Sequence, residues 1–137
     1  MGLDYSEFQK FRDNFANFTQ EFDNWIQSFL LKEGQRFIRE VKNRTPVDTG
    51  DLRNHWKLDG ITREGNTLQV WFVNSMHYAS FVEYGHAKPY KSGATPGSAD
   101  WVDGYFMMTV SLDVIQRTMP SRFNNEFEKF LASLGVK

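Results

Sequence analysis

Aromatic residues recur at alternating spacings of three and four along the first third of the chain. Such spacing places side chains on one face of an α-helix, so residues 1–42 are predicted to be helical. The stripe is formed by Phe8, Phe11, Phe15, Phe18, Phe22, Trp25 and Phe29. Gly34 interrupts the stripe before Phe37, Ile38 and Val41 resume it.

One unbroken helix over residues 4–42 is too long for a compact body of this size. It would measure roughly 58 Å, whereas a compact chain of 137 residues is roughly 37 Å across. We therefore expect the helix to break before or at Gly34, or to project and dock on something else. Two interpretations of the stripe stay open: it lies on the protein's own sheet, or it forms an arm that packs on a neighbouring subunit.

A tight turn is predicted directly after this helix. Pro46 disfavours helical angles at Thr45, and Gly50 permits a backbone conformation closed to other residues. Asp48 and Thr49 have side chains that bond nearby backbone amides in turns. We expect these five residues to be structural and to fold the helix back onto the segment that follows.

Alternating apolar and polar positions then predict a β-hairpin with a turn at residues 64–66. The first strand carries Leu52, Asn54, Trp56 and Leu58, and the second carries Leu68, Val70 and Phe72. We expect Leu58, Leu68, Val70 and Phe72 to be among the most buried residues. The opposite face holds Trp71 and Val73, and we expect it to be at least partly covered.

The second half of the chain reads as a short helix, a loop and a long helix. Residues 78–84 predict one or two helical turns, stopped by Gly85. Residues 86–100 have no periodicity and are expected to form a flexible loop. Residues 101–135 predict a helix that Pro120 kinks. The whole predicts a single α+β domain over residues 1–137: an arm and helix (1–42), a turn, hairpin and short helix (45–84), the loop (86–100) and the last helix (101–135), with a small antiparallel sheet packed against the two long helices.

Composition and charge remove several function classes. Sixteen basic and seventeen acidic residues nearly cancel, which argues against a dedicated DNA-binding module. The absence of cysteine excludes disulfides, thiol catalysis and cysteine metal sites. No segment approaches the roughly 20 apolar residues of a membrane span, so no membrane partner is expected. Aromatic residues make up 16% of the chain, which suggests additional surface buried against a partner.

Candidate chemistry is sparse. His55, His77 and His86 lack metal-site spacing; a folded cluster of His77, Glu83 and His86 could bind a metal, although scattered histidines are more often surface or turn residues. We expect no catalytic residue, no cofactor and no metal. Three cations, Lys32, Arg36 and Arg39, share a helix face. They could face nucleic acid, but a solvated face or salt bridges with a partner is commoner.

Three segments resemble the tail-completion, or head–tail joining, proteins of long-tailed phages and defective prophages. The first is the string TPVDTGDLRNHW, residues 45–56, with Leu52, Arg53 and Trp56. The second is YASFVEYGH, residues 78–86, with Tyr78, Ala79, Val82, Glu83, Tyr84 and Gly85. The third is WVDGYFMM, residues 101–108, with Trp101 and Phe106. Their order and spacing fit the family over residues 20–134.

The resemblance implies a structural virion subunit without catalysis or cofactor. It implies a homo-oligomeric ring, hexameric in the family, at the head-proximal end of the tail tube. Partners would be further copies, tail-tube proteins and head–tail connector proteins, with DNA only passing through the ring. The protein would be assembled in the bacterial cytoplasm and located in the virion.

One departure from the family lies in the longer segment 87–100, which carries Lys88, Tyr90 and Lys91. The family's helix-opening glycine would correspond to Gly104. We expect Lys88, Tyr90 and Lys91, together with Phe8, Phe11 and Phe15 of the aromatic stripe, to contribute to the assembly interface. The alternative is a small adaptor or scaffold protein that binds one partner through its N-terminal aromatic helix.

Overall fold

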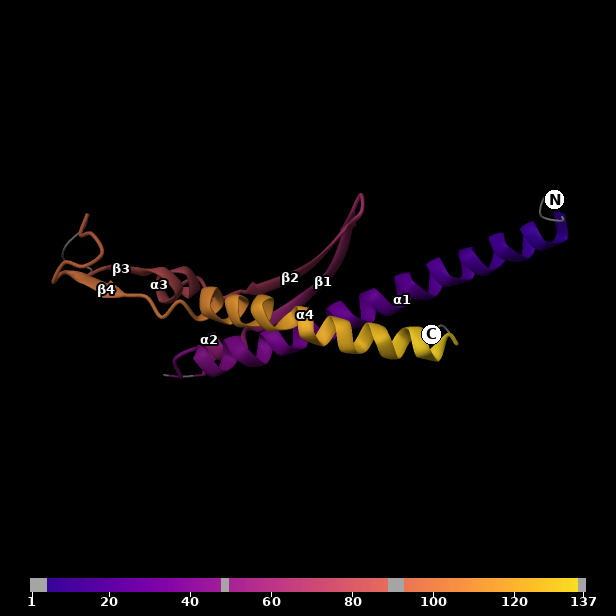
Figure 1. The fold of residues 1–137 in the computed structure, drawn as a ribbon. Coiled ribbons are helices and arrows are strands. Elements are labelled where there is room, and N and C mark those ends of the chain that lie inside the picture. Colours follow the sequence, from indigo (N-terminus) through magenta and orange to yellow (C-terminus); the bar gives the residue numbers. More distant parts are fainter. Residues whose placement is uncertain (1–4, 48–49, 89–92, 136–137) are drawn as a thin grey trace.

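The computed structural model describes residues 5–47, 50–88 and 93–135. The elements in chain order are α1 (Tyr5–Arg44), α2 (Asp51–Asn54), β1 (Trp56–Glu64), β2 (Thr67–Asn74), α3 (Ala79–Tyr84), β3 (Gly85–Ala87), β4 (Trp101–Asp103) and α4 (Met107–Ser133). This is the expected α+β fold, with two long helices and small antiparallel sheets. The molecule is elongated, with the N-terminal half of α1 at one end and the β3–β4 hairpin at the other (Figure 1).

Helix α1 is continuous through Gly34, so the expected break there is wrong. A Cβ atom at Gly34 would lie 2.8 Å from Leu58 Cδ1 and 3.4 Å from Val70 Cγ1. The glycine therefore lets the β1–β2 hairpin approach the helix closely, which is a packing role and not a helix-breaking one. The helix is about 60 Å long, and its first turns extend beyond the end of α4 (Figure 1).

The middle of the aromatic stripe packs on α4 and not on a sheet. The Trp25 ring lies 5.2 Å from Phe130 and 5.5 Å from Phe123, measured between ring centroids. Phe29 also meets Phe123 edge to face. The interpretation that the stripe lies on the protein's own sheet is therefore wrong for this part of α1, and holds only further along, where Phe37 contacts Phe72 at 4.2 Å.

The first hairpin begins later than expected. Leu52 and Asn54 belong to the helical turn α2, and β1 starts at Trp56. β1 and β2 pair antiparallel, with an irregularity between Leu58 and Gly60. Buried Leu52 holds this junction, since its backbone oxygen accepts a hydrogen bond from Asn74 Nδ2 at 2.8 Å.

The hairpin is less buried than expected. Leu58, Leu68, Val70 and Phe72 are half-buried, because the short sheet curves past a single helix and nothing encloses it. On the other face, Trp71 is 50% exposed and Val73 40%, so the described residues do not provide the expected cover. The core instead lies where α1, α2, the start of β1 and α4 converge, and consists of Phe37, Val41, Leu52, Trp56, Met107 and Ile115.

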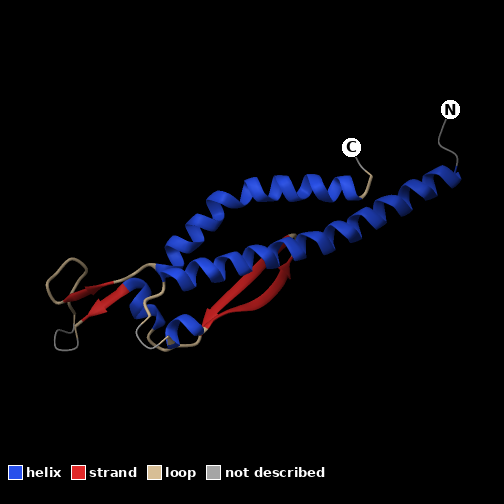
Figure 2. Ribbon diagram, turned by 90° about the horizontal axis from the view of Figure 1, so that it is seen from below, coloured by secondary structure: helices blue, strands red, loops and turns tan. Residues whose placement is uncertain are grey.

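A second small sheet replaces part of the expected loop. Residues Gly85–Ala87 pair antiparallel with Trp101–Asp103, so Trp101 lies in a strand and α4 begins only at Met107. The predicted start of the last helix at Trp101 is therefore wrong. The apolar spacing over residues 101–108 fits a short strand followed by a helix as well as it fits one continuous helix. Helix α4 contains Pro120, and it is bent in Figure 2.

Candidate assembly interface

Thr45 joins the start and the end of the first family-like segment. Its hydroxyl donates to the Val41 backbone oxygen at 2.6 Å and accepts from Trp56 Nε1 at 2.9 Å. Both Thr45 and Trp56 are buried. Between them Gly50 has a φ of 86°, the left-handed conformation that favours glycine. The motif thus folds the chain back at the end of α1, while Asp48 and Thr49 lie outside the described residues.

Glu83 in the second segment caps the last helix. Its carboxylate accepts hydrogen bonds from Met108 N at 2.6 Å, Thr109 N at 3.0 Å and Thr109 Oγ1 at 2.6 Å. Phe106, which precedes α4, provides no side-chain cap. A buried carboxylate at a helix N-terminus is stabilised by the free amides and by the helix dipole. The sequence pattern did not predict this role, because Glu83 and the start of α4 are far apart along the chain.

Two glycines let the second and third segments touch. At Gly85, a Cβ atom would lie 2.4 Å from Val102 O, and at Gly104 it would lie 2.3 Å from Glu83 O. Backbone bonds complete the contact, from Tyr105 N to Val82 O at 2.8 Å and from Phe106 N to Glu83 O at 3.0 Å. Gly104 therefore serves this contact and does not open the helix.

An ion pair joins the two long helices near their middle. Arg122 Nε and Nη2 donate to the two carboxylate oxygens of Glu33 at 2.7 and 2.6 Å, and Glu33 is only 5% exposed. Hydrogen bonding to Glu33 raises the pKa of Arg122, although partial burial opposes the shift. Because the folded-state pKa is the higher one, this stabilisation is complete below the unfolded pKa and is lost only as the pH rises through the folded one. The guanidinium is thus charged at any physiological pH.

A sequence signal for this ion pair existed. Glu33 lies four residues after Phe29 and four before Phe37, inside the apolar stripe. A carboxylate on an apolar helix face predicts a buried partner. The partner itself could not be predicted, since Arg122 comes from the other end of the chain.

Exposed aromatic side chains gather where α3, β4 and the start of α4 meet. We call this the aromatic end surface; its exposed fractions are 54% for Phe81, 57% for Tyr84, 40% for Val102, 62% for Tyr105 and 44% for Phe106. Phe106 is also the one described non-glycine residue with a positive φ, at 50°. An L-residue rarely adopts this conformation. Exposed apolar side chains that gather in one region mark interaction sites.

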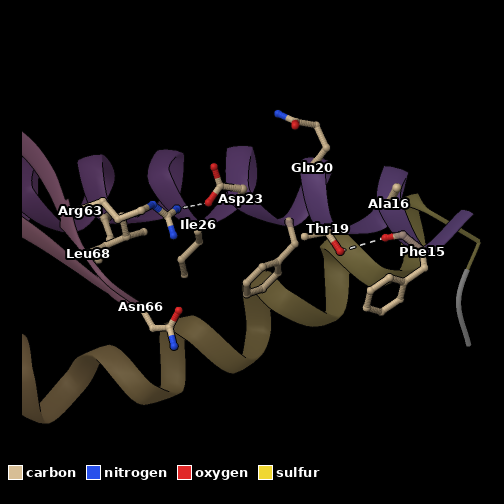
Figure 3. A pocket seen from close by; sticks show the side chains of 11 residues that line it. Phe15, Ala16, Thr19, Gln20, Asp23, Ile26, Arg63, Asn66 and Leu68 are labelled. Atoms are coloured by element: carbon tan, nitrogen blue, oxygen red, sulfur yellow. Dashed lines mark hydrogen bonds and ion pairs between the residues drawn. The ribbon is translucent and has the colours of Figure 1, made fainter. Parts of the chain in front are cut away.

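A second apolar surface lies between the N-terminal half of α1 and the tip of the β1–β2 hairpin. It is a hollow of about 780 Å³, lined largely by Phe15, Phe22, Ile26, Leu30 and Leu68. Figure 3 shows Arg63 reaching from the hairpin to its ion-pair partner Asp23 on α1. This pair ties the hairpin to the helix beside the hollow.

Of the residues expected at the assembly interface, the structure describes the side chains of Phe15 and Lys88. Phe15 is 64% exposed and lines the hollow. The Lys88 backbone N–H donates to Asp100 O at 2.8 Å and its Nζ to Ala99 O at 2.6 Å. The side chains of Phe8 and Phe11, and both Tyr90 and Lys91, lie outside what the structure describes.

The described residues contain no group of three or more His, Asp or Glu side chains arranged to hold a metal ion. Glu83 of the considered His77–Glu83–His86 cluster is bound to the α4 amides instead. No helix within the described ranges is long and apolar enough to cross a bilayer.

Comparison with known proteins gives one finding. Residues 9–85 match the family described as "Bacteriophage HK97-gp10, putative tail-component". No curated protein and no solved structure matches. The match includes the first segment and all but the last residue of the second, with Thr45, Trp56 and Glu83, and covers more than half of the chain. The chain therefore belongs to the HK97-gp10-like family of bacteriophage tail components.

Proposed function

We propose that this tail component is a structural, non-enzymatic subunit that self-associates into a ring, a hexamer, at the head-proximal end of the tail. The ring completes the tail and joins it to the head, in contact with tail-tube and head–tail connector proteins, and the genome passes through it. The observation that carries the proposal is the aromatic end surface, which a monomer would leave in water.

The position of the two apolar surfaces supports a ring over a two-fold dimer. The aromatic end surface and the hollow at Phe15 lie toward opposite ends of an elongated molecule (Figure 1). When one copy contacts the next through two different surfaces, the association is head to tail, and it closes into a ring if the rotation permits. A two-fold dimer would need only one surface.

The adaptor alternative has less support from the packing. Phe18, Phe22, Trp25 and Phe29 are half-buried or buried, and their rings contact α4. Most of the stripe therefore has an intramolecular partner and is not free to enter another protein's groove. Among the described side chains of the stripe, Phe15 is the exposed one.

Oligomeric mass tests the proposal. Light scattering after size exclusion of the wild-type protein should give a mass about six times the subunit's 16.0 kDa at high concentration. The double variant Phe81→Ser/Tyr105→Ser should be monomeric, because it removes two rings from the aromatic end surface without touching the core. The matched control Leu31→Ser/Val47→Ser, at two separate exposed positions, should keep the wild-type mass.

A wild-type protein that stays monomeric at every concentration, or a control that dissociates equally, would contradict self-association. Location in the virion is tested separately, by electron micrographs of phage made without this protein. We expect separate heads and tails; intact, normal particles would exclude the joining role.

A further inference from the structure

The seam between α1 and α4 contains a polar groove that the assembly surfaces do not include. Two adjoining hollows, of about 290 and 440 Å³, share Arg36 and Arg122 in their walls. The α4 residues that line them lie on both sides of Pro120 in the sequence, and α4 is bent in Figure 2. We call the combined feature the seam groove.

The seam groove carries positive charge on a chain that is negative overall. Five cations line it against three carboxylates, which leaves a net charge of +2, whereas the whole chain has −1. The cations are Lys32, Arg36, Arg39, Arg122 and Lys129; the carboxylates are Glu33, Glu40 and Glu126.

The carboxylates are already occupied. Glu33 accepts both hydrogen bonds from Arg122, Glu40 pairs with Arg44 at 2.5 Å, and Glu126 lies 3.6 Å from Lys129. Lys32 and Arg39 therefore face no carboxylate partner among the described residues, and Arg36 has only a longer contact of 3.9 Å with Glu33.

These three cations form a row. Neither Lys32 nor Arg39 has an ion-pair partner among the described residues, and both are exposed. Arg36 is half-exposed, and its Nε lies 3.9 Å from Glu33. At spacings of four and three residues they follow one helix face over about 10 Å.

We propose that the seam groove binds the phosphate backbone of double-stranded DNA. A row of cations along a groove matches a continuous line of negative charge better than the scattered carboxylates of a protein surface. Guanidinium groups also bind phosphate through two hydrogen bonds. The biological role of this binding rests on the proposed function, in which the genome passes through the ring of subunits. The binding of DNA by the groove does not depend on that function.

DNA binding by the purified protein tests this inference. Fluorescence anisotropy with a short labelled duplex of mixed sequence should detect binding that weakens with salt. Lys32→Glu/Arg39→Glu should weaken binding at least about tenfold and flatten the slope of log K against log salt by about 2, since two phosphate contacts are lost. The control Lys10→Glu/Lys57→Glu makes the same charge change at exposed positions outside the groove and should change affinity by less than about twofold.

Three outcomes would overturn the inference: no binding by the wild type at low salt, an equal loss in both double variants, or competition by polyglutamate as strong as by DNA at equal charge. The last outcome would assign the groove to an acidic protein. Oligomeric mass measured on the same samples separates this inference from the proposed function. DNA binding by a persistent monomer would uphold the groove and reject the ring, whereas a ring without DNA binding would do the reverse.

Discussion

At the scale of single residues, Glu83 supplies the hydrogen-bond acceptor for the first amides of α4 that the residue preceding the helix lacks. Phe106 precedes the helix and has no acceptor for its free amides, so a carboxylate from α3 takes that place. The same side chain fixes α3 against α4, and the exposed rings of Phe81 and Tyr84 flank it in sequence. A capping bond thus positions the aromatic end surface.

Glu83→Ala should lower the free energy of unfolding by about 1–3 kcal/mol, because the cap is lost and the α4 amides remain without their acceptor. Glu83→Gln should cost less, since its amide oxygen still accepts one bond. Glu128→Ala, at an exposed position on α4, should be close to neutral. Urea unfolding measures all three; equal values for Glu83→Ala and Glu128→Ala would reject the capping role.

At the scale of elements, α1 and α4 are joined by two different kinds of contact. Toward the C-terminus of α4, aromatic rings interlock around Trp25. Nearer the bend, Arg122 and Glu33 form the buried ion pair. The aromatic contact buries apolar surface area. The ion pair fixes the alignment of the two helices, because its two parallel hydrogen bonds form in only one relative position.

Arg122→Met should lower the free energy of unfolding by about 2–3 kcal/mol, because it leaves the Glu33 carboxylate buried without its main partner. The loss of stability is limited because Arg36 Nε, 3.9 Å from the Glu33 carboxylate, remains near the charge. The double variant Glu33→Leu/Arg122→Met should cost less than Arg122→Met alone, since no buried charge remains. Arg117→Met breaks an exposed pair with Asp113 and should change stability by less than about 1 kcal/mol. A double variant less stable than Arg122→Met would contradict this account.

At the scale of the whole molecule, stability and assembly are concentrated in different places. The buried core lies where α1, α2, the start of β1 and α4 converge, whereas the β3–β4 hairpin forms one end of the molecule (Figure 1). None of the core residues belongs to that hairpin. Changes at this end should therefore affect association more than folding.

Replacing residues 89–99 with Asn-Gly should change the free energy of unfolding by less than about 1 kcal/mol. The Lys88 and Asp100 backbones already pair at 2.8 Å, and a two-residue Asn-Gly turn connects such positions. Because the replaced segment includes Tyr90 and Lys91, we expect the oligomeric mass to fall. Unfolding of the variant, or an unchanged oligomer, would show that the segment is not an assembly element.

Several features were predictable because they depend on neighbours in sequence. The period of the aromatic stripe defined a helix, alternation defined β1 and β2 from Trp56 onward, and the left-handed turn at Gly50 followed from its residue type. Gly34 was misjudged for the same reason: locally a glycine weakens a helix, but here the hairpin needs its missing side chain.

Periodicity and short motifs are local properties of the chain, and they were enough to predict the fold class, the long helix, the hairpin and the family. Which partner each surface meets became evident from the three-dimensional arrangement alone. It packed the aromatic stripe on α4, brought Glu83 to the α4 amides, paired Glu33 with Arg122, and left the aromatic end surface exposed. These contacts join residues separated by up to about a hundred positions. The local sequence pattern indicates that a side chain needs a partner. Which residue becomes that partner depends on which distant segments pack together in the folded chain.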